Sequence, residues 1–470
     1  MKKLKLWIFM ILILPCCWLM TGCTFGEAYV VGIEKTGTNG TSEVYTVYYS
    51  NGKSTNFTIE NGKDGSDLEI EDIFAACVER GLYTNNNAGF KAFLADYLVV
   101  EADNSSITES VNKAAMSAVA IYSHVTTAPA YFGASTSELS CGAGVIYQME
   151  DKYSYIITNY HVVYSKNSIT SNHIAGEIIA YQYGADIEIK EVSDVWQLSG
   201  NKVECEYIGG SMNYDIAVLR VATNDLKSVN PQARAVDVAD GYTLGETAIA
   251  VGNPEGWGIS VTKGIISVLS EDLEMKGVDG INDCLFRVMR IDAAINGGNS
   301  GGGLFNADGE LIGIVNSKST NTEDGDVIEG MAYALPYDNV VKVADNIIDN
   351  FNDNDEATFG VHKFMFGIGY DVVNGRAEYN PVDGSIVLKN DLKITSLTSA
   401  LASKHFEIGD IIVGLSINGE SHVINQAHQF KDWTLTIRAG DDLLVSVIRD
   451  GQTQPVEILD VSLANFQTVA

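Results

Sequence analysis

The glycine-rich stretch at residues 297–303 (GGNSGGG) contains a single side chain that could act as a nucleophile, Ser300. Nucleophilic serine chemistry needs a hydroxyl on a tight turn, and backbone N–H groups that converge where the substrate carbonyl oxygen becomes negative. Glycines permit such a turn because they have no Cβ that would clash. A glycine-rich loop with a purely structural role is the alternative. A Walker motif is excluded because no Gly-Lys-Ser/Thr follows.

Two other residues have the chemistry that a reactive serine requires. His161 directly follows an apolar run at residues 156–158, and a neutral imidazole there could act as a general base. Asp215 precedes a second apolar run at residues 216–219, where a buried carboxylate is costly unless its charge is paired. Each residue alone is more often structural. Together they favour a site in which Asp215 orients His161 and His161 activates Ser300.

The order of the three residues along the chain is informative. His161 comes first, Asp215 second and Ser300 third. This is the order of the chymotrypsin-fold proteases, and it differs from the orders of the subtilisins and the α/β-hydrolases.

Six segments, three of which contain His161, Asp215 and Ser300, resemble in order the HtrA/Deg family of trypsin-like serine proteases, over about half of the chain (residues 115–348). The resemblance implies a mainly β fold with a chymotrypsin-like double β-barrel, two six-stranded barrels with the triad in the cleft between them. The segments are TNYHVV (158–163), YDIAVLRV (214–221), GNPEGWGISVTKGIISVL (252–269), IDAAINGGNSGGGLFN (291–306), GELIGIVNS (309–317) and GMAYALPYDNV (330–340).

The resemblance also implies a role for each matching residue. Ser300 would be the nucleophile that forms an acyl-enzyme, His161 the base and then the acid, and Asp215 the residue that orients His161. The backbone N–H groups of Gly298 and Ser300 would form the oxyanion hole. No metal or cofactor is implied. The family often forms trimers, so a homotrimer is expected by analogy.

Substrate preference is predicted from the residues expected around the pocket for the side chain before the cleaved bond. No Asp lies at the expected base of this S1 pocket, which argues against selectivity for Lys or Arg. A shallow apolar pocket would favour cleavage after small or medium aliphatic residues, with modest selectivity. The predicted lining residues are Ala294, Ile295, Ile314, Val315 and Asn316.

Short β-rich runs punctuated by Gly and Asn indicate an antiparallel barrel pair or a sandwich. Residues 106 and 109 form a capping-box pattern that predicts a helix over 111–119, and 340–348 predicts a helix that closes this unit. The predicted strands lie at residues 118–122, 144–148, 154–158, 178–181, 216–221, 248–252, 264–270, 287–291 and 311–316.

The C-terminal residues resemble a PDZ domain. We place a protease domain at residues 105–349, an acidic linker at 350–358 and the PDZ-like domain at 359–470. The segment at residues 408–419 (IGDIIVGLSING) matches a characteristic PDZ run. Backbone N–H groups around Phe366, Gly367 and Ile368 would receive peptide C-termini. A β-domain used only for assembly is the alternative.

The N-terminal residues predict a lipoprotein-type signal peptide over residues 1–22. Three lysines precede an apolar run of about 14 residues, too short to span a bilayer. The small residues before Cys23 indicate lipidation of this thiol, and ordinary secretion is the alternative. We therefore expect a lipid-anchored protein on the extracytoplasmic face of a bacterial cell membrane. Residues 23–104 are predicted to be a spacer, a small α+β region with a β-hairpin around Asn51-Gly52 and two short helices.

The composition of the chain limits the classes of partner that it could bind. The chain has 470 residues, with 30 Lys and Arg against 61 Asp and Glu, so its formal net charge of −31 argues against nucleic acid. Four cysteines lie beyond residue 23, with free thiols or one disulfide both open: Cys77, Cys141, Cys205 and Cys284. The expected function is an endopeptidase acting on unfolded or damaged proteins. The alternative is a weakly active or non-catalytic chaperone-like surface protein that binds peptides.

Overall fold

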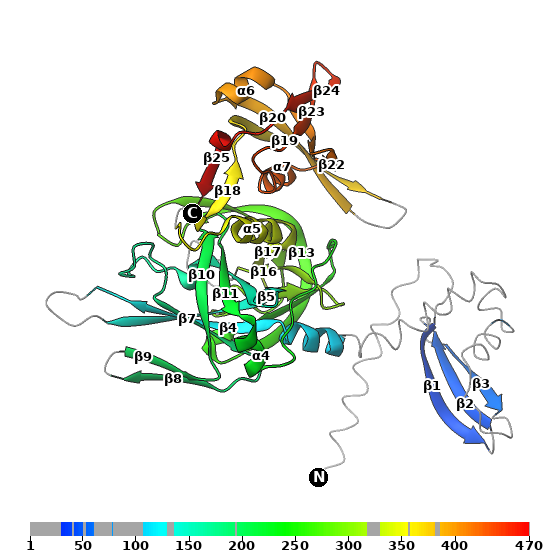
Figure 1. The fold of residues 1–470 in the computed structure, drawn as a ribbon. Helices are drawn as coiled ribbons and strands as arrows, with labels where there is room; N and C mark the ends of the chain where they lie inside the picture. Colours follow the sequence, from blue (N-terminus) through cyan, green and yellow to red (C-terminus); the bar gives the residue numbers. More distant parts are fainter. Residues whose placement is uncertain are drawn as a thin grey trace, which may run out of the picture. The chain divides into compact units, whose positions relative to one another are not determined.

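The computed structural model describes residues 30–39, 42–49, 53–60, 78, 107–128, 136–192, 195–316, 330–355, 358–380 and 386–469. The chain divides into two compact units, residues 1–104 and residues 105–470 (Figure 1). The predicted signal peptide, Cys23 and nearly all of the two predicted spacer helices lie outside the described residues. None of the helices that the structure describes is long and apolar enough to cross a membrane.

The first unit contains a three-stranded antiparallel sheet in the order β1-β2-β3. Its strands are β1 (Val30–Asn39), β2 (Ser42–Tyr49) and β3 (Ser54–Glu60). Strands β2 and β3 correspond to the predicted hairpin. The structure adds β1 beside this hairpin, a strand that was not predicted and whose two glycines lower its β propensity.

The second unit contains a closed barrel of six strands in the order β10-β11-β6-β5-β4-β7. Its interior is filled by fully buried aliphatic side chains such as Ile121, Ile156 and Leu219. Its strands are β4 (Ala118–Thr126), β5 (Ser137–Met149), β6 (Tyr153–Thr158), β7 (Glu177–Gln182), β10 (Val203–Ser211) and β11 (Ile216–Ala222). A separate surface hairpin, β8 (Ile187–Val192) with β9 (Val195–Gly200), and the helix α4 (Thr223–Val229) accompany this barrel.

A second closed barrel follows in the order β12-β13-β14-β17-β16-β15. Its core includes Ile249, Val288 and Phe305, and this confirms the predicted double-barrel fold. Its strands are β12 (Thr247–Gly252), β13 (Ser260–Lys276), β14 (Asp283–Ile291), β15 (Gly303–Phe305), β16 (Leu311–Val315) and β17 (Ala332–Pro336). The short helix η1 (Pro254–Gly256) lies in the β12–β13 connection.

The helix α5 (Tyr337–Asn350) connects the second barrel to the PDZ-like domain. Its apolar face, including Val340, Val343 and Ile347, is fully buried against the barrel core. On another side the Asn346 amide donates to the carbonyl oxygens of His362 (2.8 Å) and Leu435 (2.7 Å) of the PDZ-like domain. The helix therefore joins the two domains by both apolar and polar contacts.

The PDZ-like domain is built on a sheet in the order β19-β20-β21-β23-β24, with β22 paired to β21. Strand β19 lies at the edge of this sheet, and β18 pairs with β25 in a separate ribbon (Figure 1). The elements are β18 (Val361–Phe364), β19 (Ile368–Tyr379), β20 (Ile386–Leu397), α6 (Ala400–His405), β21 (Ile411–Ile417), β22 (Glu420–Val423), α7 (Ala427–Trp433), β23 (Leu443–Arg449), β24 (Gln452–Ile458), η3 (Leu463–Asn465) and β25 (Phe466–Val469).

The segment predicted as a linker, residues 350–358, packs against the first barrel where the structure describes it. Asn350 is the last residue of α5, and Asp353 forms a 2.7 Å ion pair with Arg220 of β11. The rings of Phe351 and Phe359 contact each other, and the Phe359 carbonyl accepts a hydrogen bond from Gly210 of β10. The described part of this acidic segment is therefore a surface turn that is packed against the first barrel, rather than a free linker.

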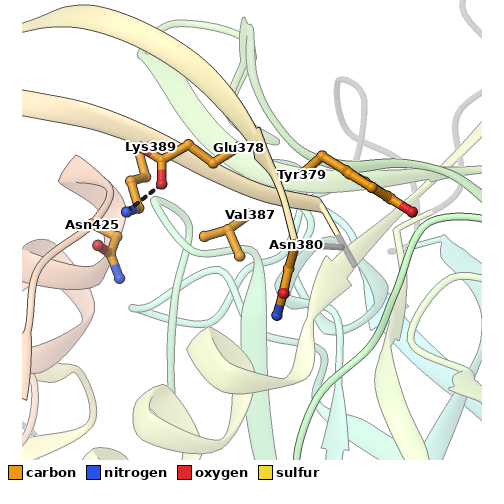
Figure 2. Close-up of a pocket in the computed structure, with 6 residues that line it drawn as sticks. All are labelled: Glu378, Tyr379, Asn380, Val387, Lys389 and Asn425. Carbon is orange, nitrogen blue, oxygen red and sulfur yellow. Dashed lines mark ion pairs between the residues drawn. The ribbon is translucent and has the colours of Figure 1, made fainter. Parts of the chain in front are cut away.

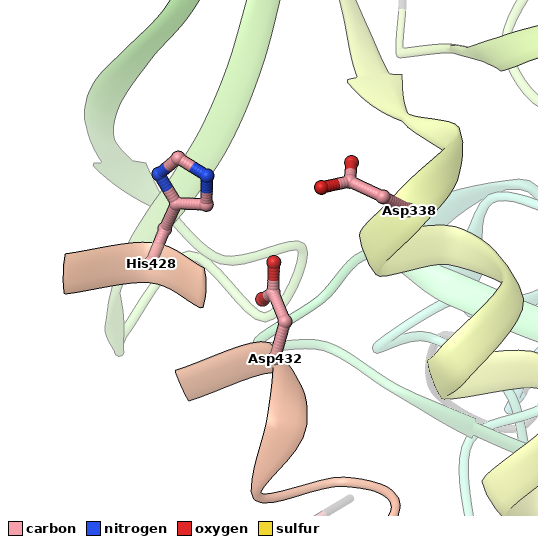
Figure 3. Close-up of side chains that lie close together, drawn as sticks. All are labelled: Asp338, His428 and Asp432. Carbon is pink, nitrogen blue, oxygen red and sulfur yellow. The ribbon is translucent and has the colours of Figure 1, made fainter. Parts of the chain in front are cut away.

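A partly buried charge cluster also joins the two domains. Arg287 of β14 donates to Asp338 of α5 (2.8 Å) and to Asp432 of α7 (3.0 Å), and the Asn339 amide also donates to Asp432. Burial raises the pKa of Asp432 to about 6, whereas burial and the Arg287 charge lower the pKa of His428 to about 3. Figure 3 shows Asp338, His428 and Asp432 pointing toward one another across α5 and α7.

Candidate active site

Barrel pairing explains why His161 and Asp215 meet. Strands β6 and β11 are antiparallel neighbours, with Thr158 opposite Ala217. His161 follows β6 on the single helical turn α3 (Tyr160–Val163), and Asp215 immediately precedes β11. The residue after one strand and the residue before its antiparallel partner lie at the same end of the sheet.

The His161–Asp215 pair is held by two hydrogen bonds. The His161 ring Nδ1 lies 2.7 Å from Asp215 Oδ2, and the His161 backbone N–H donates to Asp215 Oδ1 at 3.0 Å. A carboxylate only accepts, so Nδ1 carries the proton and Nε2 keeps a lone pair in the neutral ring. Asp215 is buried and has a positive φ of 49°, a conformation that Asp tolerates better than most residues. The Asn159 side-chain amide donates to the backbone carbonyl oxygen of Asp215 at 2.8 Å.

Ser300 lies in the loop between β14 and β15, and this loop is bonded to both barrels. The Ser300 carbonyl accepts the Ala143 N–H of β5 at 2.8 Å, and Gly301 donates to Val315 of β16 at 2.8 Å. A Cβ at Gly301, where φ is 82°, would overlap the Ala143 carbonyl oxygen and the Thr158 hydroxyl. The loop therefore fits between the barrels only with glycine after Ser300.

The Ser300 hydroxyl and His161 form no hydrogen bond in the described part of the chain. Ser300 Oγ instead donates to the backbone carbonyl of Asn316 at 3.4 Å. The Asn316 amide Nδ2 donates to Asp215 Oδ2 at 2.7 Å. One residue thus contacts both Ser300 and Asp215, and the three predicted residues lie in one site at the junction of the barrels.

The loop at residues 296–302 presents two backbone donors. Gly298 has φ of 90°, and the Gly297 carbonyl accepts the Glu255 N–H at 2.7 Å. Because the oxygen and the hydrogen of a peptide unit point in opposite directions, the Gly298 N–H points away from Glu255. Neither the Gly298 N–H nor the Ser300 N–H donates to any described residue. Both are free to bind an anionic oxygen.

The residues predicted to line an S1 pocket differ in how exposed they are. Ala294 is exposed and Ile295 is half-buried, just before the Ser300 loop. Ile314 and Val315 are fully buried in the core of the second barrel, so neither side chain is open to solvent. Asn316 also differs from the prediction, because its side chain points to Asp215. Sequence reasoning missed this role, since an Asn after an apolar strand carries no sign of its partner.

The three residues predicted to bind peptide C-termini lie at the start of β19. The Phe366 ring is buried in the domain core against Phe430 of α7, and Gly367 has φ of 74°. The Gly367 carbonyl accepts the Thr398 N–H at 2.7 Å, while the N–H groups of Phe366 and Gly367 donate to no described residue. Ile368 begins the edge strand β19.

Other polar groups of the described chain do not resemble a reactive centre. A surface hollow near the end of the β19–β20 hairpin contains the ion pair Lys389–Glu378 at 2.7 Å, and its other lining residues carry no nucleophile–base pair (Figure 2). Asp338, His428 and Asp432 are close enough to share a cation. However, the Arg287 guanidinium already lies between the two carboxylates. Cys141, Cys205 and Cys284 are free thiols.

Comparisons with known proteins agree with this geometry. The family described as "Trypsin-like peptidase domain" matches residues 142–314. The "Serine protease Do-like HtrA" of Lactococcus lactis subsp. lactis (strain IL1403) is 30% identical over 389 residues, covering 78% of this chain and 85% of that protein. The chain belongs to the Do-like HtrA family of serine proteases. Its barrel domain is the trypsin-like domain of a serine endopeptidase.

Two further proteins are similar to this chain. The "Serine protease Do-like HtrA" of Lactococcus lactis subsp. cremoris (strain MG1363) is 30% identical over 261 residues, covering 52% of this chain and 57% of that protein. Among solved structures, "HtrA-type protease AlgW with decapeptide" is 22% identical with a TM-score of 0.48, covering 77% of this chain and 99% of that chain.

Proposed function

We propose that this HtrA-family chain hydrolyses peptide bonds through a triad of Ser300, His161 and Asp215. The observation that carries the proposal is the 2.7 Å contact between His161 Nδ1 and Asp215 Oδ2, at the junction where the Ser300 loop crosses between the barrels. This contact fixes the tautomer in which His161 Nε2 can accept a proton.

The reaction then has two halves. Ser300 Oγ attacks the carbonyl carbon while its proton passes to His161 Nε2, and the imidazolium protonates the leaving amine as the C–N bond breaks. Water next attacks the acyl carbon and gives a proton to His161. The bond between this carbon and Ser300 Oγ then breaks, His161 returns the proton to Oγ, and the acid is released. Asp215 stays ionised and stabilises the imidazolium in both halves.

The N–H groups of Gly298 and Ser300 bind the oxyanion of each tetrahedral intermediate in this proposal. Their freedom from other described partners supports this role, as does the hydrogen bond that fixes the Gly297 carbonyl on Glu255. Such donors act in the transition state more than in the ground state, so they raise kcat.

Gly298→Ala is expected to lower kcat about 100- to 1000-fold with a smaller change in KM, because it displaces one oxyanion donor. A Cβ at this position of positive φ would overlap the Asn253 carbonyl oxygen, so the loop backbone must move. Steady-state cleavage of a peptide substrate measures the effect. Gly245→Ala is the matched control, since Gly245 has φ of 83°, with no atom near its missing Cβ. Wild-type kcat in Gly298→Ala would exclude this N–H from the oxyanion hole.

We propose unfolded or damaged polypeptides as substrates, cleaved after small or medium aliphatic residues. The half-buried Ile295 beside the Ser300 loop and the absence of an acidic residue at the expected pocket base support an apolar preference. The free N–H groups of Phe366 and Gly367 at the start of edge strand β19 support capture of peptide C-termini. The family resemblance supports a homotrimer.

We also propose that the protein is anchored by a lipid on Cys23 at the extracytoplasmic face of a bacterial membrane. The lysines, the apolar run and the small residues before Cys23 support this placement. Two or more acyl chains give stable attachment, since each buried methylene contributes about 0.8 kcal/mol.

Labelling with a biotinylated fluorophosphonate tests the proposed chemistry directly. This reagent reacts with serines activated by a neighbouring base, so we expect one adduct, mapped by mass spectrometry to Ser300. Heat-denatured protein should not be labelled, because the reaction depends on the assembled triad. A folded protein that degrades casein but carries its adduct elsewhere would contradict the assignment. A folded protein that is neither labelled nor proteolytic would favour the chaperone-like alternative.

A further inference from the structure

The turn at residues 254–258 (PEGWG) lies directly against the proposed oxyanion loop. It contains the short helix η1 and belongs to the connection between β12 and β13. The Glu255 N–H donates to the Gly297 carbonyl at 2.7 Å. This carbonyl belongs to the same peptide unit as the Gly298 N–H that we assign to the oxyanion hole. The side chains of the turn therefore lie close to the position of the cleaved bond.

The backbone of this turn is fixed by hydrogen bonds to the first barrel. The Tyr122 hydroxyl of β4 donates to the Gly256 carbonyl at 2.7 Å. Asn253, which is fully buried, donates from its side-chain amide to the Gly142 carbonyl of β5 at 3.0 Å. Its side-chain oxygen accepts the Gly258 N–H at 2.8 Å. A rigid support of this kind holds an exposed side chain in a defined place.

Two features of the turn are unfavourable for stability alone. Glu255 has φ of 54° and ψ of 15°, a left-handed conformation that is uncommon for residues other than Gly, Asn and Asp. Trp257 is 88% exposed, although tryptophan is among the residues that are highly buried on average. Strained backbone of this kind gathers at active sites and at ligand-binding segments. The turn is therefore a candidate for contact with the substrate.

The Glu255 carboxylate lies beside the oxyanion loop and has no cationic partner in the described part of the chain. The residue is exposed, and its Oε1 lies 3.8 Å from the position that a Cβ of Gly297 would occupy. Burial, and after it the charge of Glu255, raise the pKa of the Cys141 thiol on β5. The carboxylate thus lies near both the oxyanion loop and the first barrel, where it can attract a cation.

The turn lies on the side of the cleaved bond from which the leaving group departs. The predicted S1 residues Ala294 and Ile295 precede Gly297, and they would receive the side chain before the bond. The turn instead approaches the first barrel, where a Cβ at Gly256 would lie 3.4 Å from Cys141 Sγ. Substrate residues after the bond must leave in the direction opposite to the S1 pocket, and this direction leads to the turn.

We propose that Glu255 and Trp257 form a subsite that selects a Lys or Arg side chain at the first or second position after the cleaved bond. The cationic group pairs with the Glu255 carboxylate, and the face of the Trp257 indole attracts the same charge. The inference rests on the proposed function, because it concerns the substrate of the proposed triad. It adds a basic residue after the bond to the aliphatic residue proposed before it.

Internally quenched peptides that differ only at these two positions test the subsite in the full-length protein. Each peptide has Val before the cleaved bond and Arg, Gln or Glu at one of the positions after it. We expect kcat/KM to be about two- to fivefold higher with Arg than with Gln, the effect typical of an exposed ion pair, and lowest with Glu. The preference should shrink at high ionic strength, because salt screens exposed charges.

Glu255→Gln removes the charge at the same side-chain size and should abolish the preference for the Arg peptide over the Gln peptide. Glu255→Lys should reverse the order and favour the Glu peptide. Trp257→Ala should lower kcat/KM for the Arg peptide about two- to fivefold, whereas Trp257→Phe keeps a ring face and most of the rate. The matched control is Glu274→Gln, an exposed carboxylate at the far end of β13, which should keep the wild-type preference.

The outcomes separate this inference from the proposed function. Wild-type protein that is folded but not labelled at Ser300 by the fluorophosphonate would overturn the proposed function. Labelled wild-type protein that cleaves the Arg, Gln and Glu peptides at equal rates would overturn the subsite alone. A preference for Arg that persists in a folded Glu255→Gln variant would show that other residues select the cation.

Discussion

Ser300→Ala is expected to lower the rate of casein degradation at least about 10³-fold while the protein stays folded. The variant removes one oxygen atom, which in the proposed mechanism forms the acyl-enzyme. The hydroxyl makes only one hydrogen bond to the described protein, the 3.4 Å contact with Asn316, so its loss should change stability little. Initial rates with labelled casein, together with a thermal unfolding curve, measure both effects.

Ser123→Ala is the matched control for this result. Ser123 lies on β4 and is fully buried, and its hydroxyl has no hydrogen-bond partner among the described residues. Both substitutions delete a buried hydroxyl, but only Ser300 lies beside His161 and Asp215. Equal casein degradation by wild type and Ser300→Ala would show that another residue is the nucleophile.

The barrel strands were predictable because their burial produces simple patterns. All nine predicted strands of residues 118–316 occur, from β4 to β16. Most observed strands extend beyond the predicted bounds, whereas β16 ends one residue earlier, at Val315. The predicted helix at residues 111–119 is wrong in its extent, since the helix occupies 107–115 and Ala118 begins β4. Ala118 and Val119 are buried inside the barrels, so tertiary packing overrides the local helical pattern.

Sequence reasoning also missed β10 (Val203–Ser211), β15, β17 and the β8–β9 hairpin, and all of these except β10 lack such patterns. Strand β15 is three residues long and begins with Gly303, and β17 is five residues long and ends with Pro336. The β8–β9 hairpin lies mostly at the surface, so burial imposes little on its sequence. These elements are defined by their barrel or hairpin partners rather than by their own residues.

The residues of the candidate site also differ in whether a local sequence pattern reveals them. His161, Asp215 and Ser300 were found from the sequence because each stands beside a recognisable apolar or glycine-rich run. Asn316 was predicted to line a pocket, because its place directly after β16 does not reveal that its amide reaches Asp215. Contacts between two barrels depend on how the barrels dock, and no single segment records that.

Asp215→Asn is expected to lower kcat about 10⁴-fold. The carboxylate accepts from the His161 backbone, from His161 Nδ1 and from the Asn316 amide. An asparagine must place its NH2 against at least one of these donors. If the NH2 faces Nδ1, His161 takes the tautomer with its proton on Nε2 and can no longer accept the Ser300 proton. If it faces the backbone N–H, the ring loses the alignment that two bonds provide.

Asp410→Asn is the control for the loss of a buried carboxylate. Asp410 is 1% exposed and receives two hydrogen bonds from Arg449 in the PDZ-like domain, so its loss should lower the melting temperature. Single-turnover cleavage of a peptide substrate separates the variants, because only Asp215→Asn should slow acylation. The Asp215→Asn rate should rise at high pH, where hydroxide can replace the missing base. An Asp215→Asn variant within tenfold of wild type would show that catalysis does not depend on the orientation of His161 by this carboxylate.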